Sequence, residues 1–242
     1  HPALLVELLT EELPPHALTR LADSFAQGIR TRLAARQLLA SEDATADIYA
    51  TPRRLAVRLP GVRAQADARE IQIKGPSVAV GLDAEGQPTK ALIKWAEKQG
   101  AEVSALTRGH DGKQDVFYWS STQPGAVLAD VIGEIIVETL AQLPIPKFMT
   151  YQLADGLTTV SFVRPAHRLV VLHGDAVLPC TVLGLAADRI TDGHRFLSSG
   201  PITLENADSY ARQLREQGHV EPEYQARRVM IANELARAAQ EN

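Results

Sequence analysis

The chain has 242 residues, of which 45% are hydrophobic and only 5% aromatic, and its formal net charge is −4. A chain of this length buries about 70–75% of its unfolded surface, so it can fold around its own core without disulfides or metals. The acidic balance argues against nucleic-acid binding by the whole surface, but it is compatible with a local basic stripe. No apolar run approaches the about 20 residues of a membrane helix, and no charged-then-apolar signal segment opens the chain.

The single cysteine, Cys180, can form neither an internal disulfide nor a paired-cysteine metal site. It lies in the apolar run 176–185, and we interpret it as a small buried hydrophobic residue and not as a reactive thiol. Both points favour a reducing compartment, so we expect a cytoplasmic protein with no membrane-bound part. The first residue is His1 instead of Met, and the last expected helix lacks a capping signal. We therefore expect this chain to belong to a longer protein.

The first half of the chain shows mixed helix and strand patterns. An apolar run over 3–9, interrupted only by Glu7, predicts a buried strand, and the alternation at 55–59 predicts a half-buried one. Further strands are expected at 71–73 and 115–121, and residues 77–90 are expected to form a surface loop because they are rich in Gly and Pro. Helical periodicity and capping predict helices over 15–37, over 89–99 ending at Gly100, and over 127–143.

The second half changes character. Short runs rich in Val and Leu, separated by Gly and Asp turns, predict strands between 157 and 204, and helices are expected over 206–217 and 221–240. We therefore expect an α+β fold with mixed or antiparallel sheets, packed helices, a mainly β second half and C-terminal helices. The predicted organisation is an α+β N-terminal domain over 1–155, a mainly β unit over 156–205 packed on it, and a helical segment over 206–242.

Catalytic sequence signatures are missing. The chain has no glycine-rich nucleotide loop, no HExxH and no GxSxG. One cluster could bind a metal or transfer protons, but its spacing matches no metal pattern, so we favour structural or RNA-contact roles and predict no metal site and no catalytic residue here. This cluster comprises His167, His173, His194, Asp175 and Asp192.

Glu11 and Glu12 could be interpreted as an acid–base pair, but adjacent residues at the start of a helix point in different directions. We favour a structural role in which the two carboxylates lie near the positive end of the helix dipole. The competing hypothesis is that one of them pairs with Arg53 or Arg54.

Several cations stand beside Pro or Gly, where the backbone is rigid or tightly turned. A cation fixed in this way loses little conformational entropy when it binds a phosphate or a carboxylate. Solvated charges at strand ends are the alternative for any single site. The predicted tRNA or partner contacts are Arg53, Arg54, Lys74, Lys147, Arg164, His167, His194 and Arg195.

The motifs around these residues carry a family resemblance. In order, they are Leu4-Leu5-Val6-Glu7 with Thr10-Glu11-Glu12-Leu13-Pro14-Pro15, Ala50-Thr51-Pro52-Arg53-Arg54-Leu55-Ala56, Lys74-Gly75-Pro76, Gly86-Gln87-Pro88-Thr89-Lys90-Ala91, Leu143-Pro144-Ile145-Pro146-Lys147, Phe162-Val163-Arg164-Pro165-Ala166-His167 and Gly193-His194-Arg195-Phe196-Leu197. From residue 4 to at least 204 the chain resembles the N-terminal part of the beta subunit of bacterial two-subunit glycyl-tRNA synthetase.

The resemblance implies a part in the ATP-dependent joining of glycine to its tRNA, within an assembly of two alpha and two beta subunits. The alpha subunit of that family holds the active site with ATP and magnesium, so no cofactor is expected in this chain. The partners implied are the alpha subunit, a second beta subunit and glycine tRNA. We expect a non-catalytic tRNA-binding and assembly module. The alternatives are a hydrolytic editing domain that acts on mischarged tRNA, with His167 or His194 as proton carrier, and a pure scaffold for alpha.

Overall fold

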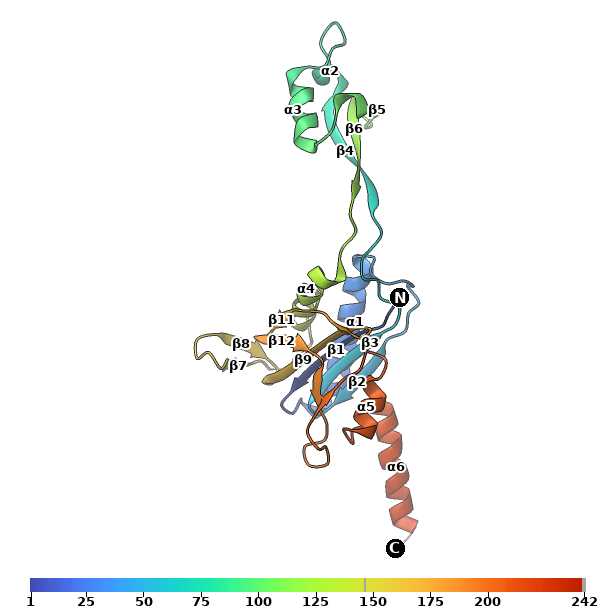
Figure 1. Cartoon of the computed structure of the whole chain (residues 1–242), viewed down its shortest axis with the longest axis vertical. Coiled ribbons are helices and arrows are strands. Elements are labelled where there is room, and N and C mark those ends of the chain that lie inside the picture. Colours follow the sequence, from blue (N-terminus) through green and yellow to red (C-terminus); the bar gives the residue numbers. More distant parts are fainter. Residues whose placement is uncertain (146, 241–242) are drawn as a thin grey trace. The chain divides into compact units, whose positions relative to one another are not determined.

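The computed structural model describes residues 1–145 and 147–240, which form two compact units (Figure 1). The larger unit combines His1–Ala66 with the segment that begins at Ala126, and the smaller unit is Asp67–Gly125. Helices and mixed sheets occur together, which confirms the α+β fold class. The two units do not coincide with the three predicted segments. A strand within 156–205 pairs with the first strand of the chain, so these two regions belong to the same unit.

The larger unit is built on a sheet whose strands follow the order β11-β12-β9-β1-β3-β2, with β10 paired to β9. All neighbours are antiparallel except β12 and β9, which run parallel. The strands are β1 (Leu4–Thr10), β2 (Asp47–Thr51), β3 (Arg54–Leu59), β9 (Ala166–His173), β10 (Ala176–Val177), β11 (Thr181–Val182) and β12 (Leu185–Asp188).

Both faces of β1 are covered, so every residue of this strand is buried. Leu4, Val6 and Leu8 pack in the core with α1 (Leu18–Ala35) and α4 (Leu128–Ala141). Successive residues of a strand point to opposite faces, and Leu5 accordingly packs in a second cluster with α5 (Tyr210–Glu216). A 3-10 turn, η1 (Pro15–Ala17), leads into α1, as the double proline predicts.

This second layer changes the environment of β3. The alternating pattern at 55–59 predicted a half-buried strand, but Leu55, Ala56, Val57 and Leu59 are all buried. The prediction was wrong because α5 and its neighbours cover the face that the sequence pattern left to solvent: Ala56 belongs to the same cluster as α5.

The remaining elements of the larger unit extend from this sheet. Two small antiparallel pairs form, β7 (Met149–Gln152) with β8 (Thr159–Phe162) and β13 (Ile190–Asp192) with β14 (Pro201–Thr203). The last helix, α6 (Tyr224–Gln240), has no buried residue and is close to the predicted 221–240.

The smaller unit is a three-stranded antiparallel sheet with short helices. Its strand order is β4-β6-β5, with β4 (Arg69–Ser77), β5 (Thr107–His110) and β6 (Asp115–Gln123), and its helical elements are α2 (Val78–Gly81), α3 (Lys90–Gln99) and η2 (Val103–Ala105). The side chain of Thr89 caps α3, and Gly100 ends it in the left-handed conformation, which confirms the helix predicted there. The segment predicted as a loop contains the short α2.

Among residues 1–145 and 147–240, no helix has both the length and the apolar character of a membrane span.

Candidate functional site

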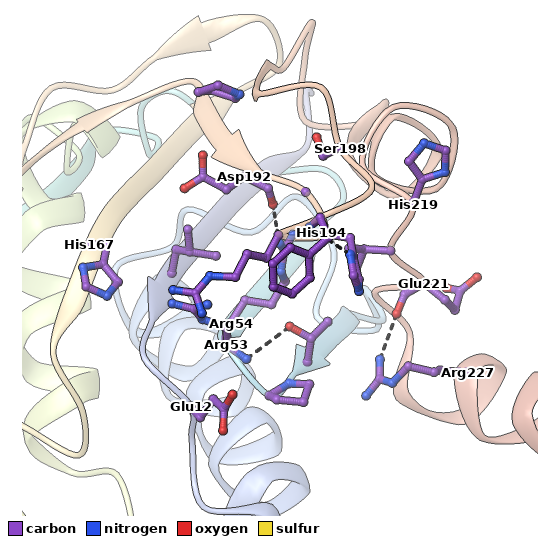
Figure 2. A pocket seen from close by; sticks show the side chains of 18 of the residues that line it. Glu12, Arg53, Arg54, His167, Asp192, His194, Ser198, His219, Glu221 and Arg227 are labelled. Atoms are coloured by element: carbon purple, nitrogen blue, oxygen red, sulfur yellow. Dashed lines mark hydrogen bonds between the residues drawn. The ribbon is translucent and has the colours of Figure 1, made fainter.

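The larger unit contains a cleft of about 810 Å³ at the end of the main sheet where β1 stops and β3 and β9 begin (Figure 2). Five segments form it: the end of β1 with the chain after it, the turn before β3, the start of β9, the connection from β13 to β14, and the chain that leads into α6 with the start of that helix. The lining residues are Leu9, Glu11, Glu12, Thr51, Pro52, Arg53, Arg54, His167, Asp192, Gly193, His194, Arg195, Phe196, Ser198, Gly200, Pro201, His219, Val220, Glu221, Arg227 and Met230.

Five of the eight predicted contact residues line this one cleft, although they come from three separate stretches of sequence. They are Arg53, Arg54, His167, His194 and Arg195. Antiparallel pairing of β1 with both β3 and β9 brings the first three together, because the end of β1 then meets the starts of the other two strands. His194 and Arg195 follow Asp192, whose backbone oxygen accepts a hydrogen bond from Arg54.

The other three predicted residues lie elsewhere. Lys74 belongs to the smaller unit, where its amine pairs with Asp111, and Lys147 is exposed but does not line the cleft. The Arg164 guanidinium donates to the carbonyl oxygen of its neighbour Val163 at 2.8 Å, and it does not line the cleft either. The cleft therefore does not unite all the basic motifs.

Arg54 lines the cleft and belongs to a buried polar cluster with Glu7 and Tyr210, which lie behind it and do not line the cleft; this cluster is called the floor below. The Arg54 Nη1 lies 3.3 Å from Glu7 Oε2, and the Tyr210 hydroxyl donates a hydrogen bond to the same carboxylate oxygen. The Arg54 Nη2 donates to the backbone oxygen of Asp192 at 2.5 Å. Arg54 was predicted as a tRNA or partner contact, and the structure buries it. Its visible role is to pair with Glu7 and to hold β13 against the sheet.

The environment fixes the protonation of this cluster. Burial alone would lower the pKa of Arg54, but the charge of Glu7 and the contacts with Tyr210 outweigh it and raise that pKa. Burial, and then the negative charge of Glu7, raise the pKa of Tyr210 well above its ordinary value. The Tyr210 hydroxyl therefore stays protonated and acts as a hydrogen-bond donor to Glu7, and Arg54 stays charged.

The wall of the cleft holds a second, more exposed cluster. Glu11 Oε2 pairs with Arg53 Nη2 at 3.0 Å, and Glu11 Oε1 lies 2.9 Å from His167 Nε2. The hydrogen bond with His167 is the largest effect on the pKa of Glu11; desolvation opposes it, and the charge of Arg53 adds to it, so that pKa lies below its ordinary value.

This pairing decides between the two hypotheses for Glu11. No acidic residue lies in the first turn of η1 or of α1, so the helix-dipole role was wrong. The competing hypothesis, pairing with an adjacent arginine, holds for Glu11 and Arg53, although the pair is partly exposed instead of buried. Glu12 is exposed and lines the cleft.

The residues 193–200 connect β13 to β14 and form one side of the cleft. His194 N donates to Gly218 O at 2.7 Å, and Ser198 N donates to His194 O at 3.0 Å. A Cβ atom on Gly193 would lie 2.5 Å from the Cα of Gly218, so this approach requires glycine. The connection is therefore fixed at its base.

The histidine cluster considered from the sequence is dispersed. His167 and His173 lie near opposite ends of β9, about 20 Å apart at the rise of an extended strand. The His173 Nε2–H donates to Val62 O at 2.8 Å, a structural contact away from the cleft. Within the described residues no group of three or more His, Cys, Asp or Glu side chains could hold a metal ion.

Several residues of the cleft were not among the predicted contacts. Asp192 accepts from Arg168 Nε at 3.0 Å, and Arg227 donates to the backbone oxygens of Ala50 and Glu221, each at 2.8 Å. His167 lies on one side of the cleft, and His219 and Glu221 lie on the other (Figure 2).

The sequence contained one signal for the buried polar cluster: Glu7 is a charged residue inside an apolar strand.

Comparison with known proteins gives the chain a family. A model described as glycyl-tRNA synthetase beta subunit matches residues 4–242. The chain is 49% identical over 242 residues to a glycine–tRNA ligase beta subunit of Delftia acidovorans, covering 98% of this chain and 34% of that protein. It is 49% identical to the Leptothrix cholodnii protein of the same name (99% and 34% covered) and 47% identical to one from Neisseria meningitidis serogroup C (96% and 33% covered). The chain spans about a third of the length of the curated relatives it matches.

Proposed function

We propose a function from one premise: the chain belongs to the glycyl-tRNA synthetase beta subunit family. Its role is in the charging of tRNA with glycine, and its own contribution is to bind tRNA at the cleft of the larger unit. The main observation in support of this proposal is that cationic and imidazole side chains from three distant segments line one open cleft.

The availability of the side chains supports this proposal. Arg195 and His194 are exposed at the cleft, and in the described part of the chain Arg195 makes no ion pair or side-chain hydrogen bond within the protein. Arginine binds phosphate through two parallel hydrogen bonds, so a guanidinium whose hydrogen-bond donors are available beside a cleft suits a nucleic-acid backbone. Arg53 is already paired with Glu11, so we expect it to contribute less.

The test is tRNA binding by the 242-residue chain, followed by fluorescence anisotropy across a salt series. Arg195→Gln should weaken binding by about 1–3 kcal/mol, the scale of a charge-assisted hydrogen bond. It should also flatten the salt dependence, because one phosphate contact is lost. Arg20→Gln removes the same charge from an exposed position on α1 and serves as the matched control. Equal, small effects of the two variants would contradict the proposal.

The whole protein enters the proposal through its family. We propose that the complete beta subunit works in the cytoplasm with an alpha subunit that holds ATP and magnesium, in a two-alpha, two-beta assembly. This chain alone should then catalyse no ATP–pyrophosphate exchange with glycine. Exchange by purified chain free of alpha would contradict this assignment.

A second candidate function is hydrolysis of mischarged tRNA. It is favoured by one observation: the Glu11 carboxylate lies 2.9 Å from His167 Nε2, and a carboxylate that orients an imidazole is a common arrangement for a general base. The assay is release of the amino acid from mischarged tRNA by this chain, with His167→Gln compared against His173→Gln. Unchanged release in His167→Gln would rule out this imidazole as the base.

A further inference from the structure

The 193–200 connection carries a pair of exposed apolar side chains at the edge of the cleft. Phe196 is 83% exposed and Leu197 is 61% exposed. Phe196 lines the cleft, and so do its neighbours His194 and Arg195. An aromatic side chain this exposed buries little of its ring in the protein core, so the face of the ring is free for a partner.

The connection is held firmly while its tip faces solvent. Asp192 pairs with Pro201 where β13 meets β14, and Arg54 donates to the Asp192 backbone from the buried floor. The His194 Nδ1 accepts a hydrogen bond from Phe196 N at 3.2 Å, and Ser198 Oγ donates to Gly200 O at 2.9 Å. The backbone around Phe196 is therefore ordered before any partner binds, which lowers the entropic cost of binding.

The chemistry beside the ring selects the kind of partner. The His194 and Phe196 ring centroids are 6.2 Å apart at an interplanar angle of 58°, and Arg195, the residue between them in sequence, lines the same cleft. An exposed aromatic ring and a cation in one cleft suit an unpaired nucleotide, whose base stacks on the ring while its phosphate binds the cation. A purely apolar protein contact would not need the adjacent charges.

We propose that the 193–200 connection binds an unpaired nucleotide of the RNA, with its base stacked on Phe196 and a neighbouring phosphate bound by Arg195. The inference rests on the proposed function, because it names the part of the tRNA that the cleft takes. The connection should therefore bind single-stranded RNA more tightly than double-stranded RNA, because bases inside a helix do not offer a free face for stacking.

The experiment compares two RNA probes on the 242-residue chain: a short single-stranded RNA that carries 2-aminopurine, and a fully paired RNA duplex. Phe196→Ala and Phe196→Leu should each weaken binding of the single strand about 10-fold, within the range of losing one base-stacking contact. Phe196→Trp should retain it. Duplex binding should change little in all three variants. Because Phe196 is exposed, melting temperatures should not move.

The outcomes separate this inference from the proposed function. If Arg195→Gln weakens tRNA binding but the Phe196 variants leave single-strand affinity and 2-aminopurine fluorescence unchanged, the stacking inference fails and the proposed function stands. If the unaltered chain binds neither RNA probe nor tRNA, both fail. If Phe196→Ala weakens association with the alpha subunit and leaves RNA binding intact, the ring is a protein contact and the inference is overturned.

Discussion

The floor of the cleft pairs Glu7 with Arg54 at 0% and 3% side-chain exposure, whereas its wall pairs Glu11 with Arg53 at 45% and 33%. In each pair the acidic residue comes from β1 or from the chain directly after it. The arginine comes from the turn before β3 or from the first position of β3, and the two arginines are adjacent in sequence. The same chemistry is thus placed in two environments within a few residues.

The difference shows how burial sets the role of an ion pair. In the floor, water cannot replace a lost partner, so each charge depends on the other. In the wall, solvent screens both charges, and each can exchange its partner for water or for a ligand. We therefore expect the floor to determine stability and the wall to take part in binding.

The largest effect is expected from Arg54→Met, which leaves the Glu7 carboxylate buried without its cation. The expected loss in the free energy of unfolding is about 3–5 kcal/mol, as for other broken buried pairs. Urea unfolding of the variant gives the measurement. The double variant Glu7→Gln with Arg54→Met removes the stranded charge and should recover part of the loss. A double variant less stable than the single one would contradict the role assigned to the pair.

Removal of the third member of the floor should have an intermediate effect. Tyr210→Phe deletes only the hydroxyl that donates to Glu7 Oε2, which keeps its contact with Arg54, and we expect a loss of about 1–3 kcal/mol from one hydrogen bond to a buried charged group. Tyr49→Phe is the control, because Tyr49 is also buried and its ring lies 5.0 Å from that of Tyr210. Equal losses in thermal unfolding would show that the hydrogen bond to Glu7 contributes little.

In the wall, Arg53→Gln should change the unfolding midpoint much less than Arg54→Met, because the pair with Glu11 is open to solvent. The same urea experiment tests this expectation with the two neighbouring variants side by side. A loss at Arg53 as large as that at Arg54 would show that burial does not separate the two pairs.

The smallest effect concerns pH. The pKa of Glu11 is lowered from its ordinary 4.5, so the folded state favours the ionised carboxylate. The resulting stabilisation is present above pH 4.5 and disappears as the pH falls through the lowered folded-state value. The stability difference between the unaltered chain and Glu11→Gln should therefore be small near pH 7 and should shrink below pH 4.5. Chemical unfolding at a series of pH values gives this difference, and a difference that grows on acidification would contradict it.

Local sequence patterns determined much of the fold. The apolar run at 3–9 and the periodicity of 15–37 predicted β1 and α1, since these signals depend on residue spacing alone. Thr89 and Gly100 fixed the ends of α3, because capping is decided within one turn of helix. The motif order also identified the family, which the comparisons confirm.

Only the tertiary structure decided which side chains meet and which are buried. Arg53 and Arg54 carry the same local pattern, yet the cover that α5 places over one face of the sheet buries only Arg54. The convergence of Arg53 and His167 depends on the pairing of β1 with β3 and with β9, and the second pairing joins residues more than 100 positions apart. Arg195 reaches the same cleft because Arg54 holds Asp192 at the end of β13. Burial and long-range pairing are properties of the packed chain, and local residue spacing does not encode them.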